Sequence, residues 1–254
     1  MGSGITATQW VVDSRPNDKV REENFSRQQV ELPDLGEGEF LVQTVYLTVS
    51  PPLRMWLTSG GLSGVPVELG EVMRGAGLGR VVKSHNANFE EGTLVRGGLG
   101  WTDFVISDGK AKMPVTRVEP PKALPLSTCM HVLGASGPTA YFGLYDIGQP
   151  RIGDVILVSA AAGSVGSIVC QLAKMSGCTV IGIAGSDKKC EWLTKELGAD
   201  AAINYRKENV AEAIPRLCPK GVDIYFDNVG GETLDAALAN ISQGARVVLC
   251  GGTS

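Results

Sequence analysis

Hydrophobic residues in the second half of the chain fall into short runs separated by segments with helical periodicity. Short apolar runs bounded by glycine or polar residues are typical of strands covered on both faces. They predict strands at 155–158, 179–184, 201–204, 222–226 and 246–250. The intervening segments predict helices at 135–145, 165–175, 188–197, 208–217 and 233–239. This alternation predicts an α/β fold with a doubly wound parallel sheet of about five strands.

The first half of the chain, up to about residue 132, has a different pattern. Its apolar runs are short or alternating, and glycine and proline separate them, as at 40–47, 77–82 and 104–106. Such a pattern is typical of a small β-rich domain that resembles a barrel. We therefore predict a β-rich domain over 1–132 and a parallel-sheet domain over 133–254.

Small residues occupy the turn between the strand at 155–158 and the helix that starts near Ser164. Ala160, Gly163 and Gly166 resemble the dinucleotide-binding fingerprint G-x-G-x-x-G, with alanine in place of its first glycine. Small residues let the backbone approach a pyrophosphate, which the N–H groups at the helix start then bind. The alternative is an ordinary strand-to-helix turn, but this position is the context that the fingerprint requires.

The next strand ends without the acidic residue that usually holds the ribose 2′-OH of NAD. Gly185 and Ser186 occupy that place, and Asp187, Lys188 and Lys189 follow. A 2′-phosphate needs cationic donors and would be repelled by a carboxylate. The sequence therefore favours NADP(H) as the cofactor. The alternative is that Asp187 caps a helix and that both lysines are solvated on its first turn.

Composition narrows the range of partners. The chain has 254 residues, 43% of them hydrophobic and 20% charged, with a net charge of −4. It contains no cluster of lysine and arginine typical of nucleic-acid binding and no apolar run long enough to span a bilayer. The N-terminus also lacks the pattern of a signal peptide. We therefore expect a cytoplasmic protein without nucleic-acid or membrane partners.

Cysteine and histidine give no indication of a metal site. The six cysteines form no C-x-x-C pair, and the only histidines are His85 and His131. Zinc sites require clustered cysteine and histidine. Several cysteines lie in apolar patterns, which is typical of reduced thiols in a core. We expect neither a structural nor a catalytic zinc.

Several separated segments together resemble the zinc-independent medium-chain dehydrogenase/reductases. The resemblance is greatest to the group of prostaglandin reductases, leukotriene B4 12-hydroxydehydrogenases, curcumin reductases and alkenal double-bond reductases. It extends over essentially the whole chain and rests on the segments 67–75, 99–105, 139–144, 160–166, 185–189, 204–205, 226–232 and 250–252. It implies a GroES-like substrate domain followed by a Rossmann domain. It also implies reduction of the C=C bond of α,β-unsaturated ketones and aldehydes with NADPH.

The resemblance also implies roles for individual residues. Gly163, Ser164, Val165 and Gly166 would hold the pyrophosphate, while Lys189 and Tyr205 would lie at the 2′-phosphate. Asn228 would bind near the ribose or nicotinamide. The nicotinamide end would be lined by Cys250, Gly251 and Gly252, with Thr139 beside it. The alternatives are that Tyr205 is a strand-end aromatic, Asn228 a turn residue and Thr139 a packed helix position.

One segment departs from the family pattern. Where relatives usually read Asp-Pro-Tyr-Met-Arg, this chain has Ser50 for the aspartate and Pro52 for a tyrosine often assigned to the substrate, while Arg54 is retained. Proline has no side-chain donor. We therefore name no catalytic acid, because Tyr46, Tyr141 and Tyr145 are expected to serve packing. Pro52 and Arg54 remain candidates for the substrate pocket.

A complete dinucleotide fold normally has a sixth parallel strand, and the chain stops at Ser254 before one is expected. The resemblance implies that the family's C-terminal segment completes the substrate cleft and a homodimer surface. We therefore interpret the chain as truncated at its C-terminus. Two hypotheses stand beside the enone reductase: an NADPH quinone or ketone reductase, and a truncated, non-catalytic NADPH-binding protein.

Overall fold

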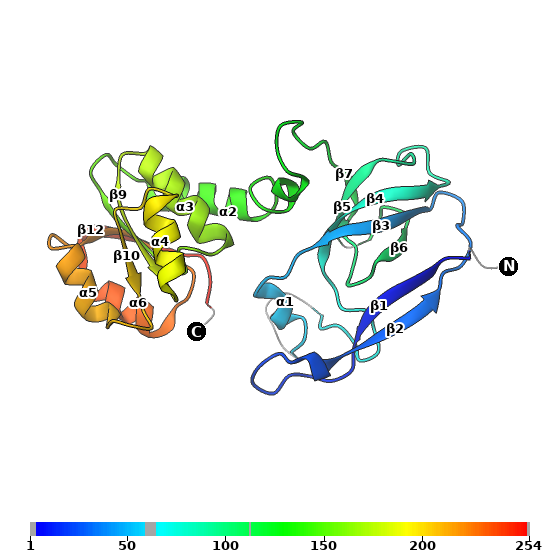
Figure 1. Ribbon diagram of the computed structural model, residues 1–254, viewed down its shortest axis with the longest axis horizontal. Helices are drawn as coiled ribbons and strands as arrows, with labels where there is room; N and C mark the ends of the chain where they lie inside the picture. Colours follow the sequence, from blue (N-terminus) through cyan, green and yellow to red (C-terminus); the bar gives the residue numbers. More distant parts are fainter. Residues whose placement is uncertain (1–3, 59–64, 112, 253–254) are drawn as a thin grey trace. The chain divides into compact units, whose positions relative to one another are not determined.

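The computed structural model describes residues 4–58, 65–111 and 113–252. The chain divides into two compact units, Met1–Met130 and His131–Ser254 (Figure 1). The change of sequence pattern near residue 132 falls close to this division. No helix among the described residues is long and apolar enough to cross a membrane.

The first unit is built from antiparallel strands. β1 (Thr6–Val12) pairs with β2 (Phe25–Glu31), and a separate five-stranded sheet has the order β6-β3-β4-β5-β7. The strands of that sheet are β3 (Phe40–Leu47), β4 (Ala76–Ser84), β5 (Leu94–Gly98), β6 (Phe104–Ser107) and β7 (Thr116–Arg117). The short helices are η1 (Glu22–Asn24), α1 (Pro52–Met55) and η2 (Leu126–Met130). The predicted β-rich architecture is confirmed.

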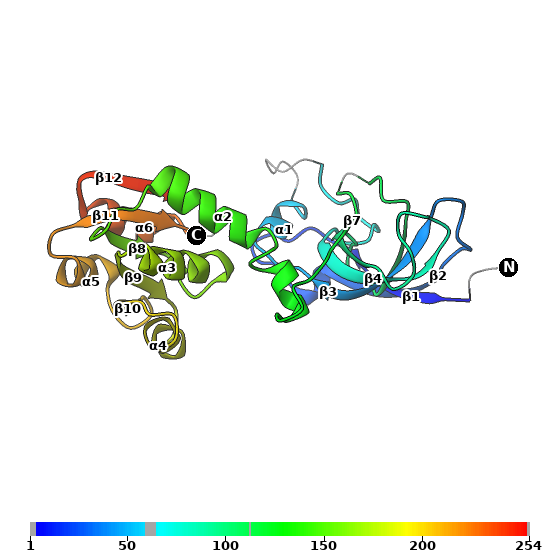
Figure 2. The ribbon, with the colours of Figure 1, turned by 90° about the horizontal axis from the view of Figure 1, so that it is seen from above.

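The second unit contains a five-stranded parallel sheet in the order β10-β9-β8-β11-β12, which Figure 2 shows in succession. Its strands are β8 (Val155–Val158), β9 (Thr179–Ala184), β10 (Ala201–Asn204), β11 (Val222–Asp227) and β12 (Ile241–Leu249). The helices between them are α3 (Ser164–Met175), α4 (Asp187–Lys195), α5 (Val210–Leu217) and α6 (Gly231–Leu238). The doubly wound fold that the sequence predicts is therefore confirmed.

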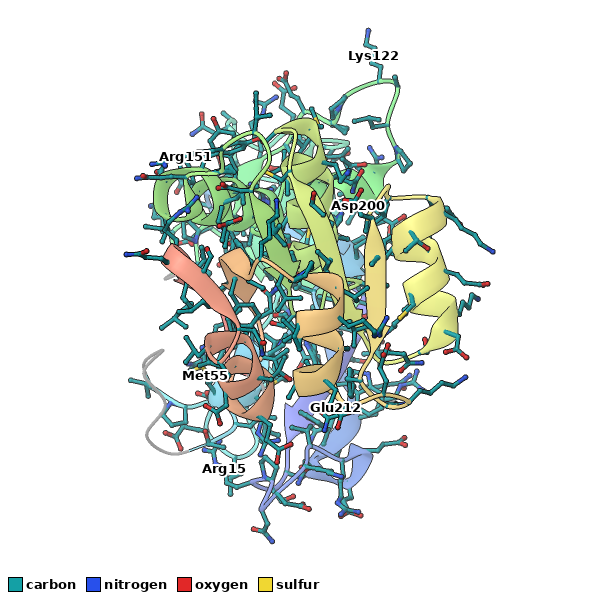
Figure 3. The ribbon with its side chains drawn as sticks, turned by 90° about the vertical axis from the view of Figure 1, so that its left-hand side faces the viewer. Arg15, Met55, Lys122, Arg151, Asp200 and Glu212 are labelled. Carbon is teal, nitrogen blue, oxygen red and sulfur yellow. The ribbon has the colours of Figure 1, made fainter. Side chains whose placement is uncertain are left out.

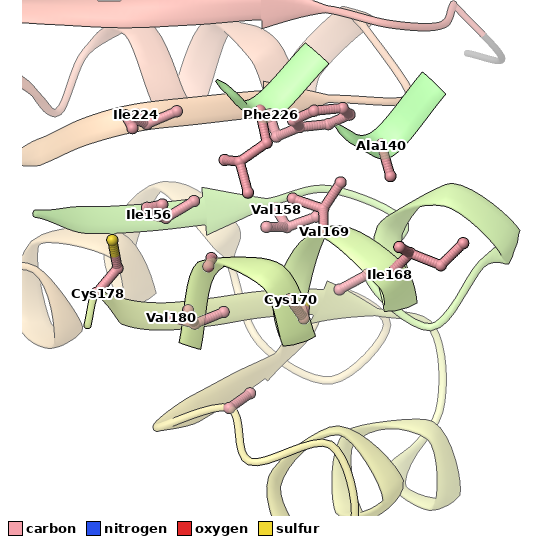
Figure 4. Packing of buried hydrophobic residues seen from close by; sticks show 14 of the residues in the cluster. Ala140, Ile156, Val158, Ile168, Val169, Cys170, Cys178, Val180, Ile224 and Phe226 are labelled. Carbon is pink, nitrogen blue, oxygen red and sulfur yellow. The ribbon is translucent and has the colours of Figure 1, made fainter. Parts of the chain in front are cut away.

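Both faces of the parallel sheet are covered. Side chains alternate along β8, so Ile156 and Val158 lie in one core and Leu157 lies in the other. The first core includes residues of α2 (Ser136–Phe142), α3 and α4, and Figure 4 shows its packing around Phe226 and Val169. The second includes Ile214 of α5 and Ala237 of α6. Burial on both faces explains why these strands are nearly continuous apolar runs.

In the second unit, the helices after β9, β10 and β11 differ from their predicted bounds by at most two residues at either end, and two other elements differ more. The helix predicted at 135–145 ends at Phe142 and continues as a π-helical segment, η3 (Gly143–Gly148). A Cβ at Gly143 would lie 2.9 Å from the Phe226 ring, so glycine lets η3 lie against the sheet. β12 begins at Ile241 rather than 246, with a register irregularity against β11. Because the first half of β12 is mainly polar, the hydrophobic pattern did not predict a strand there.

A polar link joins three elements at the amino end of the parallel sheet. Asp200, which Figure 3 labels, precedes β10 and accepts hydrogen bonds from Lys174 Nζ of α3 at 2.8 Å and from the Val180 N–H of β9 at 2.7 Å. Burial alone would raise the pKa of Asp200, but these hydrogen bonds and the positive charge of Lys174 together outweigh it, and the net pKa is lowered. The carboxylate therefore ties helix to sheet in its ionised form.

Candidate cofactor site and substrate pocket

The turn after β8 folds back against the start of α3. A Cβ at Gly166 would lie 2.4 Å from the carbonyl oxygen of Ala160, and one at Gly163 would lie 2.9 Å from the same oxygen. Ala160 itself has a φ of 44°, a left-handed conformation that is uncommon for residues other than glycine. Only glycine fits at 166 without displacing backbone.

The alignment of the turn with the fingerprint needs a correction. Counted back from Gly163 and Gly166, the first glycine of G-x-G-x-x-G falls on Ala161, not on Ala160. Ala161 is fully buried and its N–H donates to the Ile183 carbonyl of β9 at 2.9 Å. Ala161, at the first glycine position of the fingerprint, therefore ties the turn to β9. The carbonyl oxygen of the preceding residue, Ala160, lies next to Gly166.

The amino end of α3 is open to an anion. Gly163 is its N-cap, and within the described residues no side chain caps it. By contrast, Ser186 Oγ accepts from the Lys189 N–H at the start of α4, and Asn209 Oδ1 accepts from the Ala211 N–H at the start of α5. Gly163 and Ser164 are both exposed. The N–H groups of this first turn are therefore accessible to a pyrophosphate.

Two contacts to Ser164 were not foreseen from the sequence. His131 Nε2 lies 2.9 Å from the Ser164 carbonyl oxygen, so this nitrogen is the donor, and Ser136 Oγ lies 2.7 Å from Ser164 Oγ. They fix the start of α2 and the segment before it to the first turn of α3. Neither residue belongs to a motif, and both are far from Ser164 in sequence, so no local pattern indicated them.

The carboxyl ends of β9 and β10 bring together the predicted 2′-phosphate residues. A Cβ at Gly185 would lie 2.8 Å from the hydroxyl of Tyr205, whose side chain is about half exposed. Lys189 lies exposed in the first turn of α4, and its ammonium has no acidic partner among the described residues. Tyr205 directly follows β10, so its position also fits the alternative of a strand-end aromatic.

Asp187 does not cap α4, because Ser186 does so. Its carboxylate instead accepts a hydrogen bond from Asn204 Nδ2 at 2.7 Å and forms an ion pair with Lys207. The hydrogen bonds from Lys207 and then Asn204 lower the pKa of Asp187 below its usual range. Lys207 therefore neutralises Asp187, which lies two residues before Lys189 along the chain. Sequence reasoning missed Lys207, and also Arg206, whose guanidinium lies 5.9 Å from the centre of the Tyr205 ring.

The turns after β8, β11 and β12 are joined to one another. The Asn228 side chain donates to the Ser159 carbonyl oxygen and its backbone N–H donates to Ser159 Oγ, both at 2.8 Å. The N–H groups of Cys250 and Gly251 donate to the Asp227 carbonyl oxygen at 2.8 and 3.0 Å. Asn228 is therefore more than a turn residue before glycine. Burial and then the charge of Asp227 raise the pKa of the Cys250 thiol. The thiol next to these three turns is therefore neutral.

Thr139 is exposed on α2, and its hydroxyl donates to the Ala135 carbonyl oxygen of its own helix at 2.8 Å. The alternative that Thr139 is packed inside is therefore wrong. Tyr141 is also exposed, whereas Tyr145 donates to or accepts from Ser176 Oγ at 3.0 Å. The expectation of a packing role holds for Tyr145 better than for Tyr141.

The first unit contains an apolar hollow made of two adjoining cavities of about 500 and 290 Å³. Both are lined by Val20, Phe25, Val49 and Trp101. Arg54 lines the smaller cavity, and its guanidinium donates to the Asp18 carbonyl oxygen. Pro52 is exposed at the start of α1. The hollow can accept an apolar group, with Arg21 and Glu22 at the wall of the larger cavity and Arg54 at the wall of the smaller one.

Comparison with known families identifies two segments. Residues 8–115 match a model described as the N-terminal domain of oxidoreductase, and residues 164–254 match one described as zinc-binding dehydrogenase. The described residues do not fit a zinc ion, because they bring together no three side chains of histidine, cysteine, aspartate or glutamate that could hold a metal. The absence of zinc from the protein stays a prediction.

Close relatives cover almost the whole chain. It is 39% identical to the NADPH-dependent curcumin reductase of Escherichia coli (strain K12) over 95% of this chain and 69% of that protein. It is 44% identical to prostaglandin reductase 1 of Bos taurus over 91% of this chain and 68% of that protein. The crystal structure of CurA in complex with NADPH from Vibrio vulnificus superposes with a TM-score of 0.90 at 40% identity, covering 96% of this chain and 72% of that one. The chain therefore belongs to the prostaglandin reductase and curcumin reductase group of the medium-chain dehydrogenase/reductases.

Proposed function

We propose that the protein reduces the C=C bond of α,β-unsaturated ketones or aldehydes with NADPH. The observation that carries this proposal is the 40% identity, over 96% of the chain, to a reductase solved with NADPH. The open amino end of α3 and the Gly166 contact with Ala160 support it, because both suit a bound pyrophosphate.

The cofactor would lie along the carboxyl edge of the parallel sheet. Its pyrophosphate would rest against the first turn of α3, formed by Gly163, Ser164, Val165 and Gly166. The exposed Ser164 and Gly163 leave the backbone N–H groups free to donate. The dipole of a twelve-residue helix adds a favourable field at the same place.

Lys189 and Tyr205 would hold the 2′-phosphate. The ammonium supplies charge and the phenol a hydroxyl donor, which together suit a phosphate better than a ribose 2′-OH. The ion pair of Asp187 with Lys207 supports this assignment, because it reduces the repulsion that a free carboxylate would exert on the phosphate. NADP(H) is therefore the cofactor that these residues favour over NAD(H).

Asn228, Cys250, Gly251 and Gly252 would form the nicotinamide end, with Thr139 on the adjoining helix α2. The hydrogen bonds that join the turns after β8, β11 and β12 hold this backbone in place before a ligand arrives. When bound, NADPH supplies the hydride that adds to the β-carbon of the enone. The chain would orient the reactants and exclude water around them.

The apolar hollow of the first unit would receive the hydrocarbon part of the substrate. Aromatic and aliphatic side chains line it, which suits a bulky apolar group. Negative charge develops on the carbonyl oxygen during the reaction, and a donor there would stabilise the enolate. Pro52 offers none. Arg54 is the candidate from this segment.

We also propose a cytoplasmic homodimer. All six cysteines are free, and unpaired thiols are typical of reducing compartments. β12 is an edge strand among the described residues of its sheet, and Leu249 on it is 73% exposed. Apolar surface on an edge strand is typical of an interface.

A steady-state assay tests the function. The protein should oxidise NADPH in the presence of a simple aliphatic enone, and the product should be the saturated ketone. An alcohol or a hydroquinone as the product would instead favour a ketone or quinone reductase. Tight NADPH binding without reduction of any acceptor would favour a non-catalytic binding protein.

A further inference from the structure

A buried carboxylate, Asp227, lies at the end of β11 beneath the proposed nicotinamide end. Its side chain is 1% exposed, and no basic side chain pairs with it among the described residues. A single oxygen, Oδ1, instead accepts four hydrogen bonds. The donors are Tyr225 Oη at 2.8 Å, Gly230 N at 3.0 Å, and Ser159 Oγ and Val229 N, both at 3.1 Å.

Four donors suit an anion in this place. A buried charge without partners is strongly unfavourable, whereas hydrogen bonds to an ionised acceptor are roughly twice as strong as neutral ones. Gly230 is also the N-cap of α6, so the positive end of a helix faces the carboxylate. The site therefore stabilises Asp227 without any cation.

Asp227 holds three segments at once. Its carboxylate fixes the loop at 228–230 and the hydroxyl of Ser159 in the turn after β8. Its backbone carbonyl accepts from the N–H groups of Cys250 and Gly251 after β12. Ser159 Oγ in turn accepts from the Asn228 N–H. The carboxylate therefore fixes the turns after β8 and β11, whereas the backbone carbonyl of the same residue holds the turn after β12.

We infer that Asp227 is a positioning residue that presets the nicotinamide end of the cofactor site. This inference rests on the proposed function. Asp227 is buried, and its carboxylate would act by fixing the Ser159 hydroxyl and the loop that carries Asn228 in the conformation that binds. Its loss would then weaken binding of the nicotinamide half of NADPH and leave the adenosine half unaffected.

The test compares two ligands. Asp227→Asn keeps the size and one acceptor oxygen but removes the charge. We expect the Kd for NADPH to rise about 10-fold, because each of four hydrogen bonds loses charge assistance. The Kd for adenosine 2′,5′-bisphosphate, which lacks the nicotinamide half, should stay within about twofold. Its 2′-phosphate would lie at Lys189 and Tyr205 and its 5′-phosphate at the first turn of α3, and the Asp227 carboxylate bonds to neither place. Ser159→Ala is the milder variant, with the same selectivity, should Asp227→Asn fail to fold.

Asp223→Asn is the matched control. Asp223 lies at the other end of β11, where its carboxylate accepts from the Val155 N–H at 2.8 Å and from Ser242 Oγ at 2.6 Å. The substitution Asp223→Asn should lower the midpoint of thermal unfolding without changing the Kd for NADPH or the Kd for the bisphosphate. Equal losses for both ligands in Asp227→Asn, or none, would overturn the inference and leave the proposed function standing. A wild-type protein that binds the bisphosphate but not NADPH would overturn both.

Discussion

Lys189 decides, in our account, which dinucleotide binds. An ammonium that pairs with a 2′-phosphate contributes about 1.5–3 kcal/mol as a charge-assisted hydrogen bond. Lys189→Ala should therefore raise the Kd for NADPH roughly 10- to 100-fold and change the Kd for NADH little. Isothermal titration with both cofactors measures the difference. Equal weakening of both would remove the role of Lys189 at the phosphate.

Gly166 tests the close packing of the turn on α3. A methyl group there would lie 2.4 Å from a backbone oxygen, so Gly166→Ala must displace either the turn or the helix. We expect at least about a 10-fold loss of NADPH affinity, together with about 1–3 kcal/mol of stability. Gly36→Ala is the control, because a Cβ there meets only the flexible Glu39 side chain, at 3.2 Å. Unchanged NADPH binding in Gly166→Ala would contradict the proposed placement of the pyrophosphate.

At the residue scale, the positions that could be predicted are those where the size or charge of one side chain already indicates its role. Gly166 must be small because it contacts Ala160, only six residues earlier in the same turn, so a local motif reveals it. Asp227, His131 and Lys207 are ordinary residue types, and their partners come from distant segments. Nothing in a local pattern distinguishes them before the chain folds.

At the scale of elements, Asp200 makes stability depend on pH. Its pKa is lowered in the folded protein, so it stabilises the fold above its unfolded pKa of about 3.9 and loses this contribution as the pH falls through the folded value. Asp200→Asn should therefore cost about 1 kcal/mol at neutral pH, because the carboxylate is partly exposed and its ion pair is screened. Urea unfolding of the wild type and of Asp200→Asn, at neutral pH and near pH 3, measures this difference in the free energy of unfolding.

The wild-type and Asp200→Asn stabilities should converge in acid, once Asp200 is protonated. Glu191→Gln is the comparison, because its ion pair with Lys195 lies fully on the surface of α4 and should change stability little at either pH. A constant difference between wild type and Asp200→Asn across the pH range would show that the link works by packing rather than by charge.

Elements were predicted well where hydrophobic pattern alone defines them. The bounds of β8, β9 and β10 coincide with the predicted strands because both faces of the sheet are buried there. β12 begins at Ile241, which pairs with Val222 before the register irregularity. The mainly polar residues 242–245 that follow give no hydrophobic pattern from which this start could be predicted. The π-helical η3 escaped prediction because packing of its glycines against Phe226 and Val248, not helix propensity, selects it.

At the scale of the whole molecule, the change in hydrophobic pattern predicted a β-rich domain followed by a parallel-sheet domain. The family was predicted from several motifs that are far apart in the sequence. The apolar hollow of the first unit did not follow, although Arg54 on its wall was predicted for a substrate pocket. The lining residues come from β1, η1, β2, β3 and α1 and from the loops between them, including Met73 and Trp101, and they are adjacent only after folding. A hollow of this kind depends on the tertiary arrangement of strands, and single-segment patterns carry no information about it.

The transfer of a labelled hydride tests the central claim most directly. With NADPH that carries deuterium in the transferred position, a simple enone should give the saturated ketone with one deuterium on its β-carbon, detectable by NMR and mass spectrometry. That outcome follows from hydride addition to the C=C bond at the carboxyl edge of the sheet. Deuterium on the carbonyl carbon, or no labelled product at all, would contradict the account.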